Sequence, residues 1–341
     1  MKRLLIFIPI LLLGASAFGV LEGPLEWPRQ STGSKLRFEY EFRGKLKPPP
    51  RPWYVKVLRG LVGLAPQDSI RRRTKKMRLP TGIAIKGSTI YVGDLGAQAV
   101  LRYDEVEKKV EWLPKGHSLK LFSPVGIAIA PDGRIFIADS AVAKIFILSP
   151  EGRPAGIFAE AGKNLTRPVS LAFASDRLFV SDVKRHRIAV FALDGKLLYT
   201  FGKRGAKKGE FNLPSYIHYD SAKERLFVVD SGNFRIQWFS KDGKYLGGFG
   251  EVGNSPGFLA RPRGITLDSD ENLYIVDGAF EAVQVFNLKG QLLMKLGHEG
   301  AAPGTFRLPG GIAVDERNRI FVADTHNARV QAFQYLTGGG Q

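Results

Sequence analysis

The segment PGGIAVDERNRIFVADTHNARVQAFQY, residues 309–335, decides the fold. It holds three short apolar runs separated by polar turn residues, and the second run ends at Asp324. Runs of this length, rich in branched and aromatic residues, are typical of adjacent antiparallel strands. On the N-terminal side of this segment, the same order of proline, apolar strand and strand-ending aspartate recurs along the chain.

The repeats keep a period of 44 to 48 residues. The prolines that open them are Pro80, Pro124, Pro168, Pro214, Pro262 and Pro309. The strand-ending aspartates are Asp94, Asp139, Asp182, Asp230, Asp277 and Asp324. A period in the forties, with three or four short strands in each copy, indicates a propeller blade. The sequence therefore predicts an all-β, six-bladed β-propeller over residues 79–336, followed by a tail at 337–341.

The turn after each strand-ending aspartate resembles that of the NHL-repeat family, which typically carries Asp-x-x-Asn-x-Arg at this place. Residues 230–235 and 324–329 match this pattern best, whereas residues 182–187 have Arg185 where Asn is usual. The resemblance covers residues 79–335 and implies an NHL-type propeller that binds partners on one face. Two related propeller families are enzymes, a zinc-dependent amidating lyase and a streptogramin lyase, so the resemblance leaves catalysis open.

The sixth repeat lacks an outer strand, because residues 333–335 are followed only by a short Gly-rich tail. Residues 36–43 alternate apolar and charged side chains, which is typical of a half-buried edge strand. We expect this N-terminal strand to complete the last blade and close the ring, leaving no long unpaired edge. The residues before it are expected to matter little, so that truncation through Ser34 should leave the thermal midpoint nearly unchanged.

Residues 1–17 have the features of a secretory signal peptide: Lys2 and Arg3, an apolar run, and small residues at 15–17. The mature chain is expected to begin near Phe18 and to be periplasmic or secreted. Ser16 stands where a lipoprotein signal requires cysteine, which excludes lipidation. The chain has no cysteine at all, so disulfides, thiolate metal sites and thiol nucleophiles are excluded as well.

Residues 18–78 form an N-terminal arm that holds much of the positive charge. Within it, residues 35–78 carry 14 Lys and Arg against 3 Asp and Glu, in a chain whose formal net charge is +18. Apolar residues at helical spacing predict a short amphipathic helix at 53–64. The candidate polyanion-binding cluster that follows it is Arg71, Arg72, Arg73, Lys75, Lys76 and Arg78. It suits an anionic surface, with peripheral membrane contact, an acidic glycan or an acidic protein; the alternative is a solvated loop behind a capping helix.

Residue patterns give little support for catalysis. In four repeats a Lys or Arg stands five residues after the aspartate, so we interpret these carboxylates as turn caps that form surface ion pairs across a hairpin. The five histidines show no His-x-His or His-Glu-x-x-His spacing. No nucleophile elbow, phosphate loop or dinucleotide fingerprint occurs. We therefore predict no catalytic residue, no metal site and no cofactor.

In a propeller the loops before the first strand and after the second open on one face, and we expect a ligand there. The candidate residues are Arg167, Lys184, Arg185, His186, Asn233, Arg261, Arg263, Arg307, His326 and Asn327. They predict a monomeric binding or scaffold module for a protein or polyanion, and a solvated rim without a partner is the alternative. Nucleic acid is not expected despite a pI near 10, because the chain is expected to be exported.

A competing function places a lyase or hydrolase at the mouth of the central channel. In that hypothesis His186 or His326 would act as acid, base or ligand. The two histidines fall in equivalent loops of the third and sixth repeats, on opposite sides of a six-membered ring, so we do not expect them to share one ion.

Overall fold

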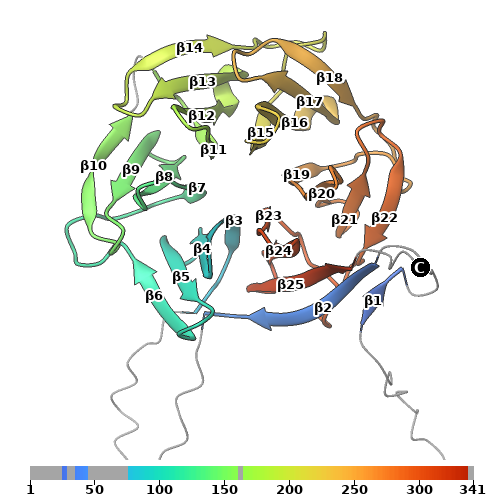
Figure 1. Ribbon diagram of the computed structural model, residues 1–341, viewed down its shortest axis with the longest axis horizontal. Helices are drawn as coiled ribbons and strands as arrows, with labels where there is room; N and C mark the ends of the chain where they lie inside the picture. The colour runs from blue at the N-terminus through green and yellow to red at the C-terminus, as the bar shows by residue number, and fades with distance from the viewer. Residues whose placement is uncertain (1–24, 29–34, 45–75, 160–163, 337–341) are drawn as a thin grey trace, which may run out of the picture.

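The computed structural model describes residues 25–28, 35–44, 76–159 and 164–336, which form six antiparallel sheets around a central axis (Figure 1). The all-β, six-bladed propeller is therefore confirmed. Residues 1–17, 53–64 and 71–75 lie outside these ranges, so the signal peptide, the short helix and most of the basic cluster remain predictions. Within the described ranges no helix is long and apolar enough to span a bilayer.

Blades one to five each have four strands, from the axis outward. Blade one is β3 (Pro80–Lys86), β4 (Thr89–Asp94), β5 (Ala99–Asp104) and β6 (Lys109–Leu113). Blade two is β7 (Pro124–Ile129), β8 (Ile135–Asp139), β9 (Lys144–Leu148) and β10 (Pro154–Ala159). Blade three is β11 (Pro168–Phe173), β12 (Arg177–Asp182), β13 (Arg187–Ala192) and β14 (Leu197–Phe201), with a 3-10 turn at Val183–Arg185.

The remaining blades follow the same plan. Blade four is β15 (Pro214–Asp220), β16 (Arg225–Asp230), β17 (Arg235–Ser240) and β18 (Tyr245–Phe249), with a 3-10 turn at Ser231–Asn233. Blade five is β19 (Pro262–Leu267), β20 (Leu273–Asp277), β21 (Ala282–Phe286) and β22 (Leu292–Leu296). Blade six is β23 (Ile312–Val314), β24 (Arg319–Asp324) and β25 (Arg329–Leu336), joined by β2 (Lys35–Phe42) and β1 (Glu26–Trp27).

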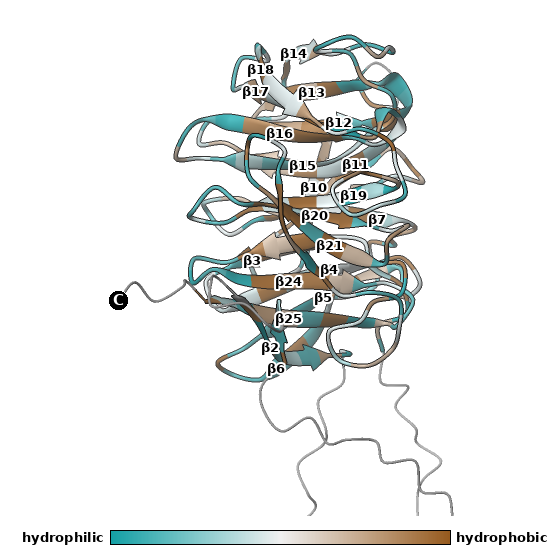
Figure 2. Cartoon of the chain, turned by 90° about the vertical axis from the view of Figure 1, so that its right-hand side faces the viewer, coloured by the Kyte–Doolittle hydropathy of each residue, from teal (hydrophilic) through white to brown (hydrophobic). Residues whose placement is uncertain are grey.

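The core lies in the seams between blades, because each sheet is covered on both faces by its neighbours. An aromatic residue stands three positions before the strand-ending aspartate in every blade, namely Tyr91, Phe136, Phe179, Phe227, Tyr274 and Phe321, and each is at most 7% exposed. Burying one such ring stabilises the fold by roughly 1.5–3 kcal/mol. Viewed edge-on, hydrophobic colour follows the strands and hydrophilic colour gathers in the loops at both faces (Figure 2).

The six strand-ending aspartates are fully buried, each at 0% exposure. Each carboxylate accepts backbone N–H groups from the loop that enters its own blade. Asp277, for example, accepts the N–H groups of Ala260 at 2.8 Å and Arg261 at 2.9 Å. The expectation of structural turn caps is confirmed. The expected ion pairs form in blades three, four and six, with Arg187, Arg235 and Arg329, but they are not surface pairs, because the carboxylates have no exposed surface.

Strand β2 closes the ring as predicted, one residue earlier than expected. It pairs antiparallel with β25 from Lys35 opposite Leu336 to Phe42 opposite Val330. Glu41 of β2 also forms an ion pair with Arg329, which is 1% exposed and bonds Asp324 at 2.7 Å. The N-terminal strand therefore contributes a charge to the buried network of the last blade.

Residues before β2 also take part in the last blade, which favours a larger contribution to stability than the sequence indicates. Strand β1 pairs with the outer edge of β2, with Glu26 opposite Arg37 and Trp27 opposite Leu36. The Trp27 ring packs edge-on against Phe333 with centroids 5.8 Å apart. A two-residue strand is too short to show an alternating pattern in the sequence, and for that reason β1 escaped sequence reasoning.

Two truncations measure separately how much β1 and β2 contribute to stability. Deleting residues through Ser34 should lower the free energy of unfolding by about 2 kcal/mol, because the Trp27 contact with Phe333 is lost. Deleting through Arg43 should prevent cooperative unfolding of the ring, since β25 then presents an apolar edge to water. Thermal unfolding followed by circular dichroism distinguishes the two, and equal midpoints for both truncations would contradict this account of closure.

Candidate functional site

The turns after the second strands share one backbone geometry. In each, the residue four positions after the aspartate is left-handed, with φ between 49° and 55°: Gln98, Ala143, His186, Phe234, Glu281 and Ala328. These turns and the linkers that enter each blade form one side of the ring, here called the loop face. Because the backbone is the same in all six turns, the side chains decide what each blade presents.

Asn233 and Asn327, both predicted as ligand-binding residues, are occupied by internal contacts. The Asn233 amide donates to the Gly205 carbonyl and to Asp230, both at 2.8 Å. The Asn327 amide donates to Gly300 and Asp324 in the same way. Their role is to fasten the linker onto the turn, so the structure does not support a ligand role for either residue.

A glutamine seven residues after the aspartate completes these networks, and sequence reasoning missed it. Gln237 donates to the Glu210 carbonyl at 2.8 Å and accepts the Gly209 N–H at 3.0 Å. Gln331 makes the equivalent contacts in blade six. The recurrence of Gln at the same offset in blades four, five and six was the available signal.

The two candidate histidines occupy different positions within their turns. His186 accepts the N–H of Leu213 through Nδ1 at 3.1 Å, which links blade three to the entry of blade four. Glu281 makes the matching contact with the N–H of Leu308 between blades five and six, and burial raises its pKa. His326 lies two positions earlier in its turn and is exposed. Among the described residues no three histidine or carboxylate groups gather as a metal site would require.

Apart from Arg185, the other predicted cations of the loop face have no carboxylate partner among the described residues. Arg167, Lys184, Arg261 and Arg307 are exposed, and Arg263 is half-buried at the channel mouth. On the opposite face, by contrast, arginines bind carboxylates of the next blade. Arg319 reaches Glu105 at 2.6 Å, and Arg177 reaches Asp242 at 3.2 Å. Within the described part of the chain, the cross-blade pairing of the opposite face therefore has no counterpart at Arg167, Arg261 or Arg307.

Blade three places a second guanidinium group beside its strand-ending aspartate. Arg185 stands where Asn occurs in blades four and six, and both Arg185 and Arg187 lie 3.9 Å from the single buried carboxylate of Asp182. Burial, and then the charge of Arg185, lower the pKa of the Arg187 guanidinium. Two guanidinium groups of this blade therefore lie close to one buried carboxylate.

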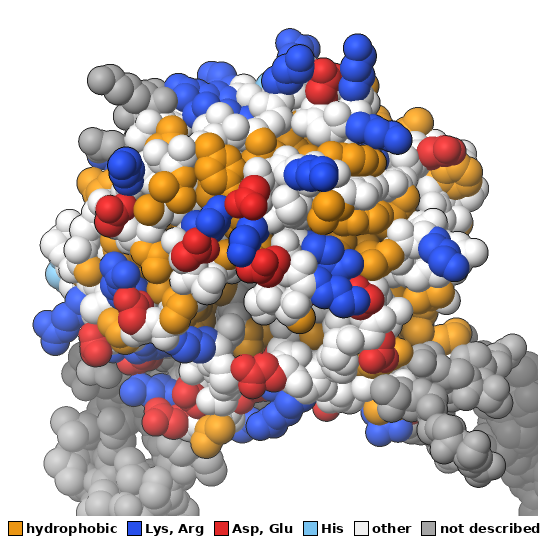
Figure 3. Space-filling view, turned by 45° about the horizontal axis from the view of Figure 1, so that its top comes forward, with side chains coloured by type: hydrophobic (Ala, Val, Ile, Leu, Met, Phe, Trp, Pro, Cys, Tyr) orange, Lys and Arg blue, Asp and Glu red, His pale blue; other side chains and the backbone are white. Residues whose placement is uncertain are grey.

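The linker from blade three to blade four adds four exposed cations that sequence reasoning did not place on this face. Residues 202–213 connect β14 to β15. Arg235 holds this linker in place by donating to the carbonyls of Ala206 and Lys207. Glu210 is the one carboxylate of this linker. The basic patch defined here consists of Arg167, Lys184, Arg185, Lys203, Arg204, Lys207 and Lys208. Figure 3 shows one side of the molecule, with Lys and Arg gathered along its upper edge and mixed with Asp and Glu elsewhere.

Most of the predicted arm cluster, Arg71 to Lys75, lies outside the described residues. Lys76 and Arg78 are described, and both are exposed. The backbone N–H of Arg78 bonds Asp94 at 2.7 Å. The arm therefore enters blade one on the loop face.

Comparison with known protein families gives a match to one repeat of the propeller. The family model of the NHL repeat matches residues 306–333, the part of blade six that contains the Asp324 network. The chain is an NHL-repeat β-propeller. No match was found among curated proteins.

Solved structures similar to this NHL-repeat propeller have diverse functions. A gluconolactonase from Xanthomonas campestris is 19% identical, with a TM-score of 0.58 over 76% of this chain and 87% of that one. A streptogramin B lyase is 13% identical, with a TM-score of 0.57 over 87% and 98%. An auxiliary nutrient binding protein from Bacteroides thetaiotaomicron is 13% identical, with a TM-score of 0.59 over 76% and 69%. At these identities the likeness shows the fold alone.

Among the described residues that line the central channel, His218 is the one histidine. Four of the other inner strands have alanine at this position, and blade five has Thr266. Although His218 keeps part of its surface open to the channel, the surrounding strands withdraw it from bulk water. This burial lowers its pKa to about 4, so the imidazole is neutral at physiological pH.

His218 should make stability depend on pH. The unfolded chain protonates this histidine near pH 6.5, whereas the folded chain keeps it neutral down to about 4. The contribution of His218 to the free energy of unfolding is therefore fully present above the pKa that it has in the unfolded chain. This contribution is lost as the pH falls toward the pKa that it has in the folded chain. Between pH 7.5 and 5.0 the parent should lose about 2 kcal/mol more than His218→Thr. Urea unfolding of both proteins at the two pH values tests this, and parallel losses would contradict it.

Proposed function

We propose that this NHL-repeat propeller is an exported binding module that holds an anionic partner on the basic patch of blades three and four. The observation that carries the proposal is the density of positive charge in the patch, where five of the seven cations form no ion pair among the described residues: Arg167, Lys184, Arg204, Lys207 and Lys208. Repulsion among like charges disfavours such a cluster, and a bound anion relieves this repulsion.

The rigid framework suits binding. The linker that presents Lys203 to Lys208 is fixed through its own backbone by Asn233, Arg235 and Gln237. Little loop ordering is then required when a partner arrives, which reduces the entropic cost of association. An acidic protein or an acidic glycan fits this surface, and the exposed Arg78 of the arm adds positive charge to the same face.

Export is part of the proposal, because the compartment decides which anions the patch meets. The Lys2-Arg3 start and the small residues at 15–17 support cleavage of a signal peptide. N-terminal sequencing of the protein isolated from its native source should begin near Phe18. Recovery of the intact Met1 form in the cytoplasm would overturn this part and make nucleic acid a candidate partner.

Binding to immobilised heparin, used as a model polyanion, tests the patch. The variant carries Lys203→Gln, Arg204→Gln, Lys207→Gln and Lys208→Gln. At 0.15 M salt its affinity should fall at least about tenfold, since each cation near an anionic surface contributes roughly 1 kcal/mol. The salt dependence of binding should become shallower in the variant.

A matched control removes the same number of positive charges from the opposite face. Lys108, Lys196, Lys244 and Lys289 are exposed and lie in turns between third and fourth strands. Replacing all four with Gln should leave heparin binding within about twofold of the parent. If patch and control variants lose affinity equally, binding reflects net charge alone, and the patch is not the site.

A further inference from the structure

Two arginines of blade five converge where the central channel opens on the loop face. Arg261 directly precedes β19, and Arg263 is the second residue of that strand. A Cβ atom added to Gly278 would lie 3.3 Å from Cδ of Arg263 and 3.6 Å from Cδ of Arg261. Both arginine side chains therefore pass over Gly278, the residue that follows β20.

Glycine at position 278 removes a hydrogen bond that joins neighbouring blades elsewhere in the ring. In blade four the equivalent residue is Ser231, whose hydroxyl donates to the carbonyl of Pro262 at 3.0 Å. In blade six it is Thr325, whose hydroxyl donates to the carbonyl of Pro80 at 2.7 Å. The backbone of Gly278 is not left-handed, so the local conformation does not require glycine. A departure from the repeat that gives up a contact is expected at a functional site.

The guanidinium of Arg263 forms no hydrogen bond or ion pair among the described residues, although this side chain is half-buried. Glu281, the carboxylate of the turn after β20, accepts the N–H of Leu308 instead. The other half-buried arginines of the described chain all have internal partners: Arg102, Arg134, Arg177, Arg185, Arg187, Arg225, Arg235 and Arg319. A guanidinium has five N–H donors, and leaving them unpaired away from water is unfavourable. The donors of Arg263 are therefore available to a ligand.

Tyr216 of blade four adds a hydroxyl group from the other side of the seam. Its ring packs against the cluster between blades four and five that includes Phe227 and Ile265. Burial raises the pKa of the Tyr216 hydroxyl, and the nearby charge of Arg263 lowers it. The hydroxyl therefore lies near the Arg263 guanidinium and is protonated at neutral pH. The inner strands of the other blades have only Gly or Ser at this position, namely Gly82, Gly126, Ser170, Gly264 and Gly311.

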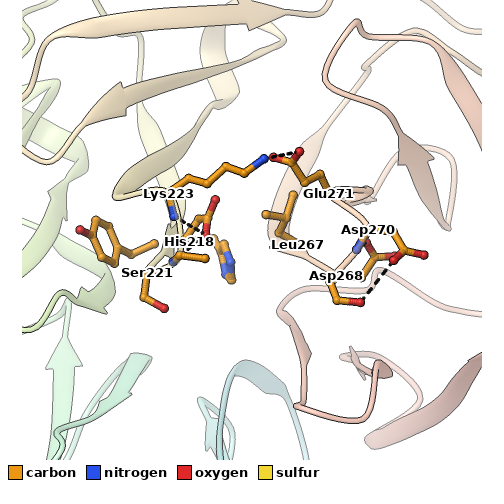
Figure 4. Close-up of a pocket in the computed structure, with 11 residues that line it drawn as sticks. His218, Ser221, Lys223, Leu267, Asp268, Asp270 and Glu271 are labelled. Atoms are coloured by element: carbon orange, nitrogen blue, oxygen red, sulfur yellow. Dashed lines mark hydrogen bonds and ion pairs between the residues drawn. The ribbon is translucent and has the colours of Figure 1, made fainter.

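The opposite end of the same seam shows how cations are neutralised inside this protein. There Lys223 of blade four reaches across to Glu271 of blade five, with its Nζ 2.5 Å from a carboxylate oxygen (Figure 4). Arg225 bonds Asp220 at 2.7 Å beside this bridge. At the loop-face end, no described carboxylate does the same for Arg261 or Arg263. An anion from outside the chain would complete that end of the seam.

We propose that Arg261, Arg263 and Tyr216 form a binding site for one oxyanion, the carboxylate or phosphate group of a small molecule, at the loop-face mouth of the central channel. The planar guanidinium fork matches such groups with two parallel hydrogen bonds, and the phenol hydroxyl supplies a further donor. The site belongs to blades four and five and contains none of the seven cations of the basic patch. It therefore does not rest on the proposed function.

Isothermal titration of the whole chain at constant ionic strength tests the site. Inorganic phosphate and acetate represent the two kinds of oxyanion, and chloride serves as the anion without a planar or tetrahedral group of acceptors. Phosphate or acetate should bind saturably with a stoichiometry of one, and the tighter of the two identifies the group that the site prefers. Failure of both to bind more tightly than chloride would overturn the proposal.

Variants with one arginine removed locate the binding. Arg263→Gln should weaken binding of the preferred anion at least about tenfold, because hydrogen bonds from a charged donor are lost. Arg317→Gln is the matched control, since it removes an exposed arginine from the turn before β24 on the opposite face and should leave the affinity unchanged. A thermal scan of each variant verifies folding. Full affinity in a folded Arg263→Gln variant would overturn the site, as would an equal loss in Arg317→Gln.

Two further variants separate this site from a general attraction to positive charge. Gly278→Val keeps both arginines and introduces the residue of blade three, Val183, whose side chain would displace theirs, so binding should weaken here too. The basic-patch variant should bind the preferred anion within about twofold of the parent, because exposed charges at a distance are screened by salt. A loss in that variant as large as in Arg263→Gln would overturn the proposal.

Discussion

The buried carboxylate at the end of each second strand is the interaction on which the rest of the molecule depends. Six aspartates at 0% exposure accept the backbone N–H groups of the loops that enter their blades. A charge in this position is tolerable only because several donors converge on it. The same contacts fix the linker, the turn and the start of the inner strand, so one side chain per blade sets the geometry of the loop face.

Much of this architecture could be read from the sequence because it repeats. The prolines and aspartates keep one order, and the alternation in residues 36–43 marks the strand that closes the ring. The direction in which a side chain points within a turn was harder to infer. Asn233 and Asn327 were expected to face a ligand, yet both amides turn inward to their aspartates. Polar residues with such short side chains hydrogen-bond to neighbouring groups as readily as to solvent, and the pattern alone cannot separate the two outcomes.

The candidate sites were less accessible to sequence reasoning than the fold. The cations of residues 203–208 belong to a linker whose side of the ring depends on how Arg235 and Gln237 hold its backbone. His218 is one histidine within a strand-like run, and nothing local indicates that five other strands place small residues around it. Both features depend on contacts between segments that are distant in sequence, and a repeat pattern does not predict such contacts.

The last blade has a consequence for the order in which the chain folds. Each of blades one to five joins strands that are neighbours in sequence, so its ladder closes short loops. Glu41 and Arg329, in contrast, are separated by 288 residues. Contacts of such range form slowly, because the entropy of closing the intervening loop must be overcome first. Local blades therefore assemble before the ring is joined, and until then β2 and β25 remain unpaired edges that a second chain can capture. The seam of blade six is accordingly where this propeller is most exposed to strand exchange between molecules.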